Sequence, residues 1–230
     1  MTQDQDLTDV RERAQNGEAP AMYELAMALY EEDPRANLDE SAYWLMRSAK
    51  EGYPFGQYMV GKWHAKGVYT VANADEASRW IVRATESPEV VELVKQEAAE
   101  DDADALCTLG ALHFYGRTGV EQSFDKAFAC FKSAAQLGAP RAMYNLARCY
   151  ERGDGCEVDL EQALHWYSSG ARRGVSLAAD RLGAWYLFGH HAFAIDYRKA
   201  HLYLRMAAAF GEPGGLQYMR VHGLTPERVN

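Results

Sequence analysis

Residues that would build a disulfide framework, a structureless linker or a basic surface are scarce in this chain. Its 230 residues include only four cysteines and seven prolines. Four cysteines in a chain of this length do not make a disulfide scaffold, and so few prolines argue against long linkers. Basic residues number 24 against 33 acidic ones, a formal charge of −9. Because nucleic-acid binding needs a basic footprint, we expect no nucleic-acid partner.

Long apolar stretches are also missing. No run approaches the roughly 18 consecutive apolar residues of a membrane-spanning helix, so we expect no membrane span. Residues 1–6 are polar and acidic, whereas a secretory signal begins with basic residues and continues with an apolar stretch. These features predict a cytoplasmic location.

The sequence lacks the common motifs of catalytic, cofactor and metal sites. It has no phosphate-binding Gly-x-x-x-x-Gly-Lys-Ser/Thr loop, no Gly-x-Ser-x-Gly elbow, no His-Glu-x-x-His and no paired Cys-x-x-Cys. His64 and His113 fall in a helical stripe, where we expect them to pack, and His190 and His191 are too close in sequence to share a helix face. The cysteines are expected to be free, buried thiols. We therefore predict no catalytic residue, no metal and no cofactor.

The chain repeats itself with a period of about 36 residues. Apolar, tiny and large residues recur at offsets +4, +5 and +8 of a first segment, which places them on one helix face. These first segments begin at Ala21, Gly56, Ala105, Ala142 and Ala178. A second helical segment follows each, anchored at Ser41, Ala77, Ala127, Ala163 and Ala200, with successive spacings of 36, 50, 36 and 37 residues. Since one helix pair cannot bury both of its faces, such units must stack.

The repeat resembles the Sel1-like repeat, a relative of the tetratricopeptide repeat. The fourth copy carries the resemblance best, with AMYNLARCYERGDG at 142–155 and DLEQALHWY at 159–167. The first copy reads Glu-Glu-Asp-Pro at 31–34 in place of the Gly-x-Gly loop, and the second ends in Pro88 where the others have glycine. The resemblance covers about residues 18–215. It implies an all-α fold, an α-solenoid (α/α superhelix) of about five helix-turn-helix repeats curving around a concave face.

The repeat register predicts how the chain is divided. We expect one solenoid domain over residues 1–230, with terminal capping helices and one inserted helix. The segment 86–104, which contains the inserted helix, carries eight acidic residues and one basic residue. The predicted segments are an N-terminal capping helix at 1–19, repeats at 20–53, 54–86, 103–139, 140–175 and 176–212, an inserted acidic helix at 87–102, and a C-terminal cap and tail at 213–230.

The resemblance also indicates where a partner would bind. In the tetratricopeptide geometry the first helix of each pair lines the concave face, so its positions not used for packing are candidates. They are rich in tyrosine, phenylalanine, methionine and arginine, which are enriched in interfaces. For the aromatic residues, filling the inner curve of the solenoid is the alternative role. The candidate partner-binding residues are Tyr23, Met27, Tyr30, Tyr58, Lys62, Phe114, Tyr115, Arg141, Tyr144, Arg148 and Arg152.

The sequence favours a non-catalytic protein–protein interaction module, an adaptor or scaffold, that is monomeric alone and binds a protein or peptide. An acidic segment would suit its basic and aromatic face. One alternative is a cytoplasmic immunity or inhibitor protein that neutralises a bacterial toxin, with the acidic segment 86–104 as the contact. A second is a hydrolase acting on cell-wall or β-lactam substrates, which would need a nucleophile beside a base in a pocket.

Overall fold

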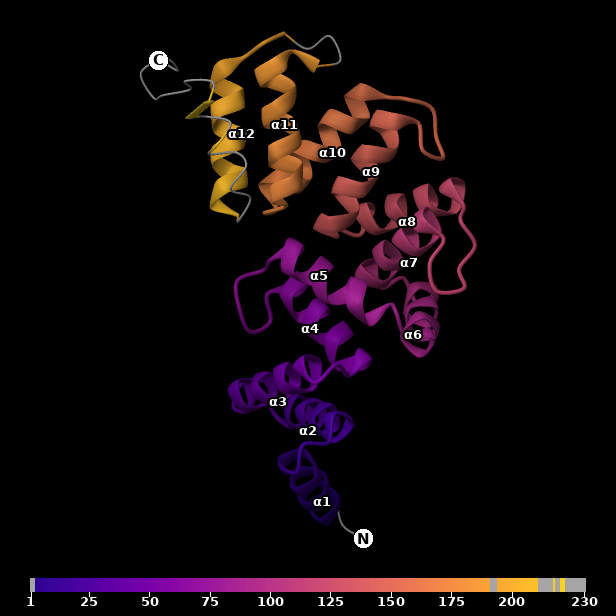
Figure 1. The fold of residues 1–230 in the computed structure, drawn as a ribbon, viewed down its shortest axis with the longest axis vertical. Coiled ribbons are helices and arrows are strands. Elements are labelled where there is room, and N and C mark those ends of the chain that lie inside the picture. The colour runs from indigo at the N-terminus through magenta and orange to yellow at the C-terminus, as the bar shows by residue number, and fades with distance from the viewer. Residues whose placement is uncertain (1–2, 191–193, 211–216, 218–219, 222–230) are drawn as a thin grey trace. The chain divides into compact units, whose positions relative to one another are not determined.

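The computed structural model describes residues 3–190, 194–210, 217, 220 and 221. Helices are the regular elements of this described part, which contains no strand, and the all-α prediction is confirmed. Figure 1 shows helices α1 to α12 in chain order. They are α1 Gln3–Gln15, α2 Ala19–Glu32, α3 Leu38–Lys50, α4 Pro54–Lys66, α5 Ala74–Ala84, α6 Pro88–Ala99, α7 Ala103–Tyr115, α8 Phe124–Gln136, α9 Pro140–Arg152, α10 Leu160–Arg172, α11 Ser176–Phe188 and α12 Tyr197–Ala209.

Helix ends are set by the residues that the repeat pattern singles out. The first helix of each of the last four repeats ends at a glycine in the left-handed conformation, with φ between 63° and 78°. A residue with a Cβ adopts this conformation reluctantly, so glycine is the favoured stop. The second helices then begin at a side chain that accepts hydrogen bonds from first-turn amides. These caps are Asn73, Ser123, Asp159 and Asp196.

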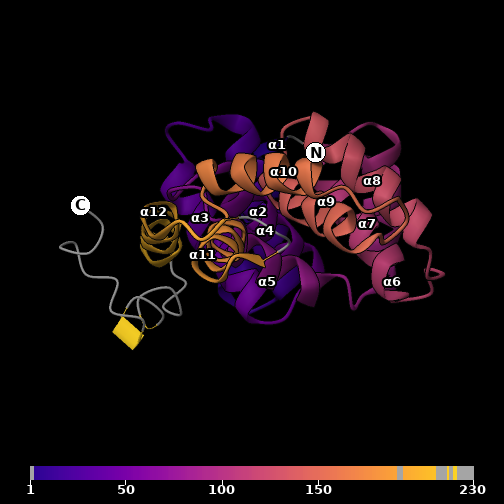
Figure 2. The same ribbon diagram turned by 90° about the horizontal axis from the view of Figure 1, so that it is seen from above.

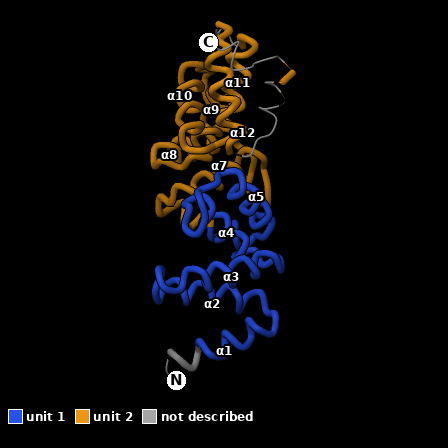
Figure 3. Tube along the Cα trace, turned by 90° about the vertical axis from the view of Figure 1, so that its left-hand side faces the viewer, with its two compact units in different colours: residues 1–93 blue, residues 94–230 orange. Residues whose placement is uncertain are grey.

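The chain divides into two compact units, Met1–Leu93 and Val94–Asn230, coloured blue and orange in Figure 3. The core of unit 1 lies among α1 to α4 and includes Met22, Leu25 and Leu45, all nearly or fully buried. Two buried serines of α3 donate hydrogen bonds to carbonyl oxygens of the α2 segment. Ser41 Oγ lies 2.6 Å from the Ala26 oxygen and Ser48 Oγ lies 2.7 Å from the Ala19 oxygen. Small polar residues thus satisfy their own hydrogen bonds while letting the two helices approach.

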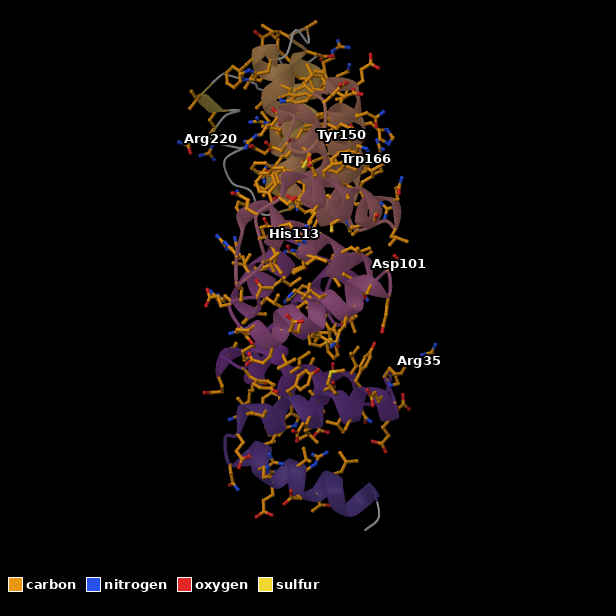
Figure 4. All side chains as sticks on the ribbon, turned by 90° about the vertical axis from the view of Figure 1, so that its right-hand side faces the viewer. Arg35, Asp101, His113, Tyr150, Trp166 and Arg220 are labelled. Atoms are coloured by element: carbon orange, nitrogen blue, oxygen red, sulfur yellow. The ribbon has the colours of Figure 1, made fainter. Side chains whose placement is uncertain are left out.

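The core of unit 2 runs through α7 to α12. One cluster joins α7, α8 and α9, and half-buried Tyr150 and Trp166 pack against it (Figure 4). A second cluster joins α11 and α12, which lie side by side in Figures 1 and 2. In both units the main contacts join helices that are adjacent in sequence or one apart, as stacked repeats require.

The predicted extra elements have different outcomes. The amphipathic helix expected in the insertion is α6, and Asp102 beyond it caps α7 by accepting from the amides of Asp104 and Ala105. The cap and tail predicted at 213–230 lie almost wholly outside the described residues, as does His191. One solenoid domain over residues 1–230 stays a prediction. Among the described helices, none is both long enough and apolar enough to cross a membrane.

Candidate partner-binding surface

The candidate residues of unit 2 come together at the end of α7 and along α9. Four of them, Arg141, Tyr144, Arg148 and Arg152, follow one another at three or four residues and so form one stripe of α9. The stripe runs from buried to open, because Arg141 is 8% exposed, Tyr144 and Arg148 are half-buried and Arg152 is exposed. Tyr115, in the last turn of α7, is 52% exposed.

Arg148 is held by aromatic side chains on several sides. Its Cζ lies 5.3 Å from the ring centroid of Phe114 and 5.7 Å from that of Tyr144, both within cation–π range. Partial burial acts to lower the pKa of Arg148, but a hydrogen bond to Tyr115 and the nearby Tyr144 outweigh it, so the pKa is raised overall. The guanidinium is therefore charged and lies against the rings of Phe114 and Tyr144. We call Tyr115, Tyr144, Arg148 and Arg152 the Arg148 patch.

A buried carboxylate beside this patch has its partners within the protein. Glu151, whose side chain is 3% exposed, accepts a hydrogen bond of 2.7 Å from the Tyr167 hydroxyl. The guanidinium of Arg181 on α11 donates to it through Nη2 at 2.6 Å and Nε at 3.1 Å. Burial, followed by the hydrogen bond to Glu151, raises the pKa of Tyr167. Removing either partner would leave this buried charge poorly satisfied.

The two arginines of the Arg148 patch differ from Arg181 in having no carboxylate partner among the described residues. Within the described residues, neither Arg148 nor Arg152 forms an ion pair with a carboxylate, whereas Arg181 is paired with Glu151. The patch thus presents positive charge in a partly desolvated aromatic setting. The sequence analysis did not select Arg181, which lies three residues after Ala178, the anchor of the fifth first segment. The polar residues Glu24, Thr108 and Asn145 at that offset in other copies were the available signal.

The candidate residues of unit 1 are used more for packing. Tyr30 lies 4.9 Å from the Trp63 ring, and Tyr23 lies 5.7 Å from the Tyr53 ring, centroid to centroid. Tyr23, Met27 and Tyr30 are half-buried.

Three of the candidate positions are used for packing, which for Tyr58 is the alternative role considered for the aromatic residues and for Lys62 and Arg141 is a correction. Tyr58 is only 1% exposed, while Lys62 and Arg141 are each 8% exposed. The Lys62 ammonium lies over the Tyr58 ring at 5.6 Å. These three side chains have little surface left for a partner, whereas partner contact at the other candidate positions stays a prediction.

Chemically, the described side chains offer binding groups more than reactive ones. No three described histidine, cysteine, aspartate or glutamate residues form a group that could hold a metal ion. Burial raises the pKa of the Cys149 thiol to about 12, and burial also raises that of Cys107. Thr70 Oγ1 lies 3.5 Å from Nδ1 of His64, but it donates its hydrogen to the Val71 carbonyl at 3.2 Å. That hydroxyl is therefore poorly arranged for activation by the imidazole.

Several proteins similar to this chain are described as regulators. The chain is 31% identical over 104 residues to chitin synthase regulatory factor 3 of Schizosaccharomyces pombe, covering 43% of this chain and 11% of that protein. It is 34% identical over 83 residues to chitin synthase regulator SKT5 of Saccharomyces cerevisiae, and the match covers 34% of this chain and 12% of that protein. It is 30% identical over 70 residues to the ERAD-associated E3 ubiquitin-protein ligase component HRD3A of Arabidopsis thaliana. This match covers 30% of this chain and 10% of that protein. The chain thus spans only about a tenth of the length of these relatives.

Two solved bacterial structures share the fold. A Sel1 repeat protein from Oxalobacter formigenes matches with a TM-score of 0.51 and 26% identity, over 92% of this chain and 68% of that one. The protective antigen c5321 of uropathogenic Escherichia coli matches with a TM-score of 0.53 and 24% identity, over 94% and 44%. The relatives reported above, in contrast, are fungal and plant proteins.

A family model confirms the repeat predicted from the sequence. The model described as Sel1 repeat matches five times, at residues 19–53, 54–87, 103–138, 140–175 and 176–209. These matches cover well over half of the chain, and the described part is built of the helix pairs that the repeat requires. This chain belongs to the Sel1 repeat family and has its α-solenoid fold.

Proposed function

We propose that this chain is a non-catalytic protein-interaction module, an adaptor or scaffold, and that the Arg148 patch binds an acidic segment of a protein partner. The observation that carries the proposal is the half-buried guanidinium of Arg148, held between Phe114 and Tyr144 with no acidic partner among the described residues. A fixed arginine loses little side-chain entropy when it binds a carboxylate.

The surroundings of Arg148 suit a peptide better than a small anion. Tyr115 is 52% exposed and Tyr144 is half-buried, so both offer apolar surface beside the charge. Arg152 adds a second positive charge one turn along α9. Aromatic and arginine side chains in this arrangement are typical of interface hot spots. A carboxylate accepting two hydrogen bonds from Arg148, next to an apolar side chain, would use the whole patch.

The named relatives support a non-catalytic role. Two are described as regulators of chitin synthase and one as a component of a ubiquitin ligase. Such descriptions fit proteins that act through partners, and the stacked helix pairs of this chain supply surface for contact. A monomeric state alone and a cytoplasmic location stay predictions.

The two alternatives have less support. A toxin inhibitor would use the acidic segment 86–104, whose Glu89 and Glu92 are exposed on α6. A hydrolase would need a nucleophile activated by a base, and the Thr70–His64 contact is poorly arranged for that.

The test is affinity capture from source-cell lysate with wild type, with Arg148→Glu/Arg152→Glu, and with Lys126→Glu/Arg205→Glu. The last variant makes the same charge change at exposed positions of α8 and α12. We expect a partner that binds wild type and the control equally and binds the patch variant at least about 30-fold more weakly, the effect of losing about 2 kcal/mol at a hot spot.

Equal capture by all three proteins would reject the Arg148 patch as the binding site. If the retained partner were then lost on Glu89→Lys/Glu92→Lys, the toxin-inhibitor alternative would replace the proposal.

A further inference from the structure

Unit 1 contains a groove on α3, which is the second helix of the first repeat, whereas the Arg148 patch lies on first helices. Its volume is about 310 Å³, near the lower end of the range for ligand pockets. The floor is one face of α3, since its residues recur at i, i+3, i+4, i+7, i+8 and i+11 along the helix, and Tyr69 from the α4–α5 loop forms a wall. The floor residues are Asp39, Ala42, Tyr43, Met46, Arg47 and Lys50.

The centre of the groove is apolar and aromatic. Tyr43 is 55% exposed and Tyr69 is 44% exposed, whereas Met46 beside them is half-buried. Tyrosine exposed in a concave site is a common anchor for partner side chains. The Tyr43 side chain is positioned by its neighbours, because its ring meets the Trp44 ring edge-on at 5.1 Å and its hydroxyl oxygen accepts a hydrogen bond of 3.4 Å from Nη1 of Arg47.

The two ends of the groove carry opposite charges. Asp39 lies in the first turn of α3, and Arg47 and Lys50 lie in its last turn. At a rise of about 1.5 Å per residue, Asp39 and Lys50 are about 16 Å apart along the helix, or three turns. Neither forms an ion pair with another described residue. The Arg47 guanidinium lies over the rings of Tyr43 and Trp44, at 5.8 and 5.4 Å.

From this polarity we propose that the groove binds a three-turn amphipathic helix of a protein partner, antiparallel to α3. Helices usually carry acidic residues in their first turn and basic residues in their last, where these charges complement the helix dipole. Only the antiparallel direction brings such acidic residues to Arg47 and Lys50 and such basic residues to Asp39. Apolar side chains spaced at i, i+3 or i+4, and i+7 would then contact Tyr43, Met46 and Tyr69, as in other helix-in-groove complexes.

The proposal can be tested with two synthetic peptides, stapled to hold the helix because short isolated helices are marginal in water. The forward peptide has glutamates in its first turn, leucine and phenylalanine in the apolar stripe, and lysines in its last turn. The reversed peptide exchanges the glutamates and lysines and keeps everything else. Binding is measured by fluorescence anisotropy, and the contact is located by amide chemical shifts in residues 39–50 and at Tyr69.

We expect the forward peptide to bind at least about 5-fold more tightly than the reversed one, from two exposed charge contacts. In the variant Asp39→Lys/Arg47→Glu/Lys50→Glu, which exchanges the charges at both ends of the groove, this preference should invert. Tyr43→Ala should weaken the forward peptide at least 5-fold through loss of the aromatic contact. Val82→Ala, at an exposed position of α5 outside the groove, should bind like wild type. Arg148→Glu/Arg152→Glu should also bind like wild type, which separates this groove from the Arg148 patch.

Three results would overturn the proposal. The first is no binding of either peptide up to about 1 mM, the weakest affinity worth assigning to a specific site. The second is a preference that the charge exchange does not invert. The third is self-association of the chain that Tyr43→Ala abolishes, because that result would assign the groove to a second copy of this protein.

Discussion

Two glycines in the helices of unit 2 have opposite surroundings, and the same substitution should affect them in opposite directions. A Cβ on Gly183 would lie 2.6 Å from Cδ2 and Cγ of Leu204, a side chain that is 1% exposed. A Cβ on Gly170 would meet Cβ of Ala178 at 3.4 Å, an ordinary van der Waals contact. Gly183 thus allows α11 and α12 to approach, whereas Gly170 leaves room for a methyl group.

We therefore expect Gly183→Ala to lower the free energy of unfolding by about 1–3 kcal/mol through overpacking. Gly170→Ala should raise it by about 0.5–1 kcal/mol, because alanine restricts the unfolded chain and favours helix. Urea unfolding followed by circular dichroism measures both. Equal effects of the two substitutions would contradict the close approach of α11 and α12 at Gly183.

Individual residues also show how far the sequence predicts the site. The spacing of α9 correctly placed Tyr144, Arg148 and Arg152 on one stripe, because helix periodicity fixes which positions share a face. For Tyr58 on α4 the spacing left packing and partner contact open, and the side chain is 1% exposed. Periodicity does not say how closely the next helix covers a face. The Glu151–Arg181 pair joins two repeats, so a pattern compared copy by copy does not contain it.

At the scale of the element, the helix caps couple the fold to pH. Asp196 begins α12 and accepts a hydrogen bond of 3.0 Å from the Lys199 amide. This bond, followed by the smaller effect of the Lys199 charge, outweighs burial and lowers the pKa of Asp196 below its ordinary value. A lowered pKa in the folded state means that the stabilisation is present at neutral pH. It is lost as the pH falls through about 4, the unfolded value, and below.

Asp196→Ala should therefore reduce stability by about 1 kcal/mol at pH 7 and by progressively less below pH 4. Asp196→Asn is the matched control, since asparagine caps nearly as well but does not titrate. Thermal unfolding of the three proteins between pH 7 and pH 3 provides the comparison. A loss on Asp196→Ala that stays constant across this range would show that the carboxylate does not act as the cap of α12.

Most helices could be predicted from the sequence because the same helix pair recurs in five copies of the repeat. The glycine stops and the capping residues recur in register, and one clear copy such as 142–167 supports weaker ones. The groove on α3 was not predictable in this way. Its wall is Tyr69, in a loop whose course the repeat does not specify, and its floor lies on a second helix, where no partner contact was expected.

At the scale of the whole molecule, the contacts are local in sequence. The main helix–helix contacts join neighbours along the chain, and residues 1–93 and 94–230 form separate compact units. In repeat proteins, stability is approximately a sum of terms for each repeat and its interfaces with neighbours. A lesion in one unit should then open that unit first, and the chain should not unfold as one all-or-none structure.

Leu25→Ala tests this expectation in unit 1. Leu25 is fully buried in the core shared by α2 and α3, so its truncation should cost about 2–5 kcal/mol. We expect hydrogen exchange of α2 and α3 amides to speed up by about 1.5 to 3.5 orders of magnitude, because about 1.4 kcal/mol corresponds to a factor of ten. Amides of α9 and α10 should change little.

Leu182→Ala, at a fully buried position of α11, is the reciprocal variant and should accelerate exchange in unit 2 while leaving α2 and α3 unchanged. Equal acceleration in both units by either variant would mean that the chain unfolds cooperatively, and local contacts alone would then not account for its stability.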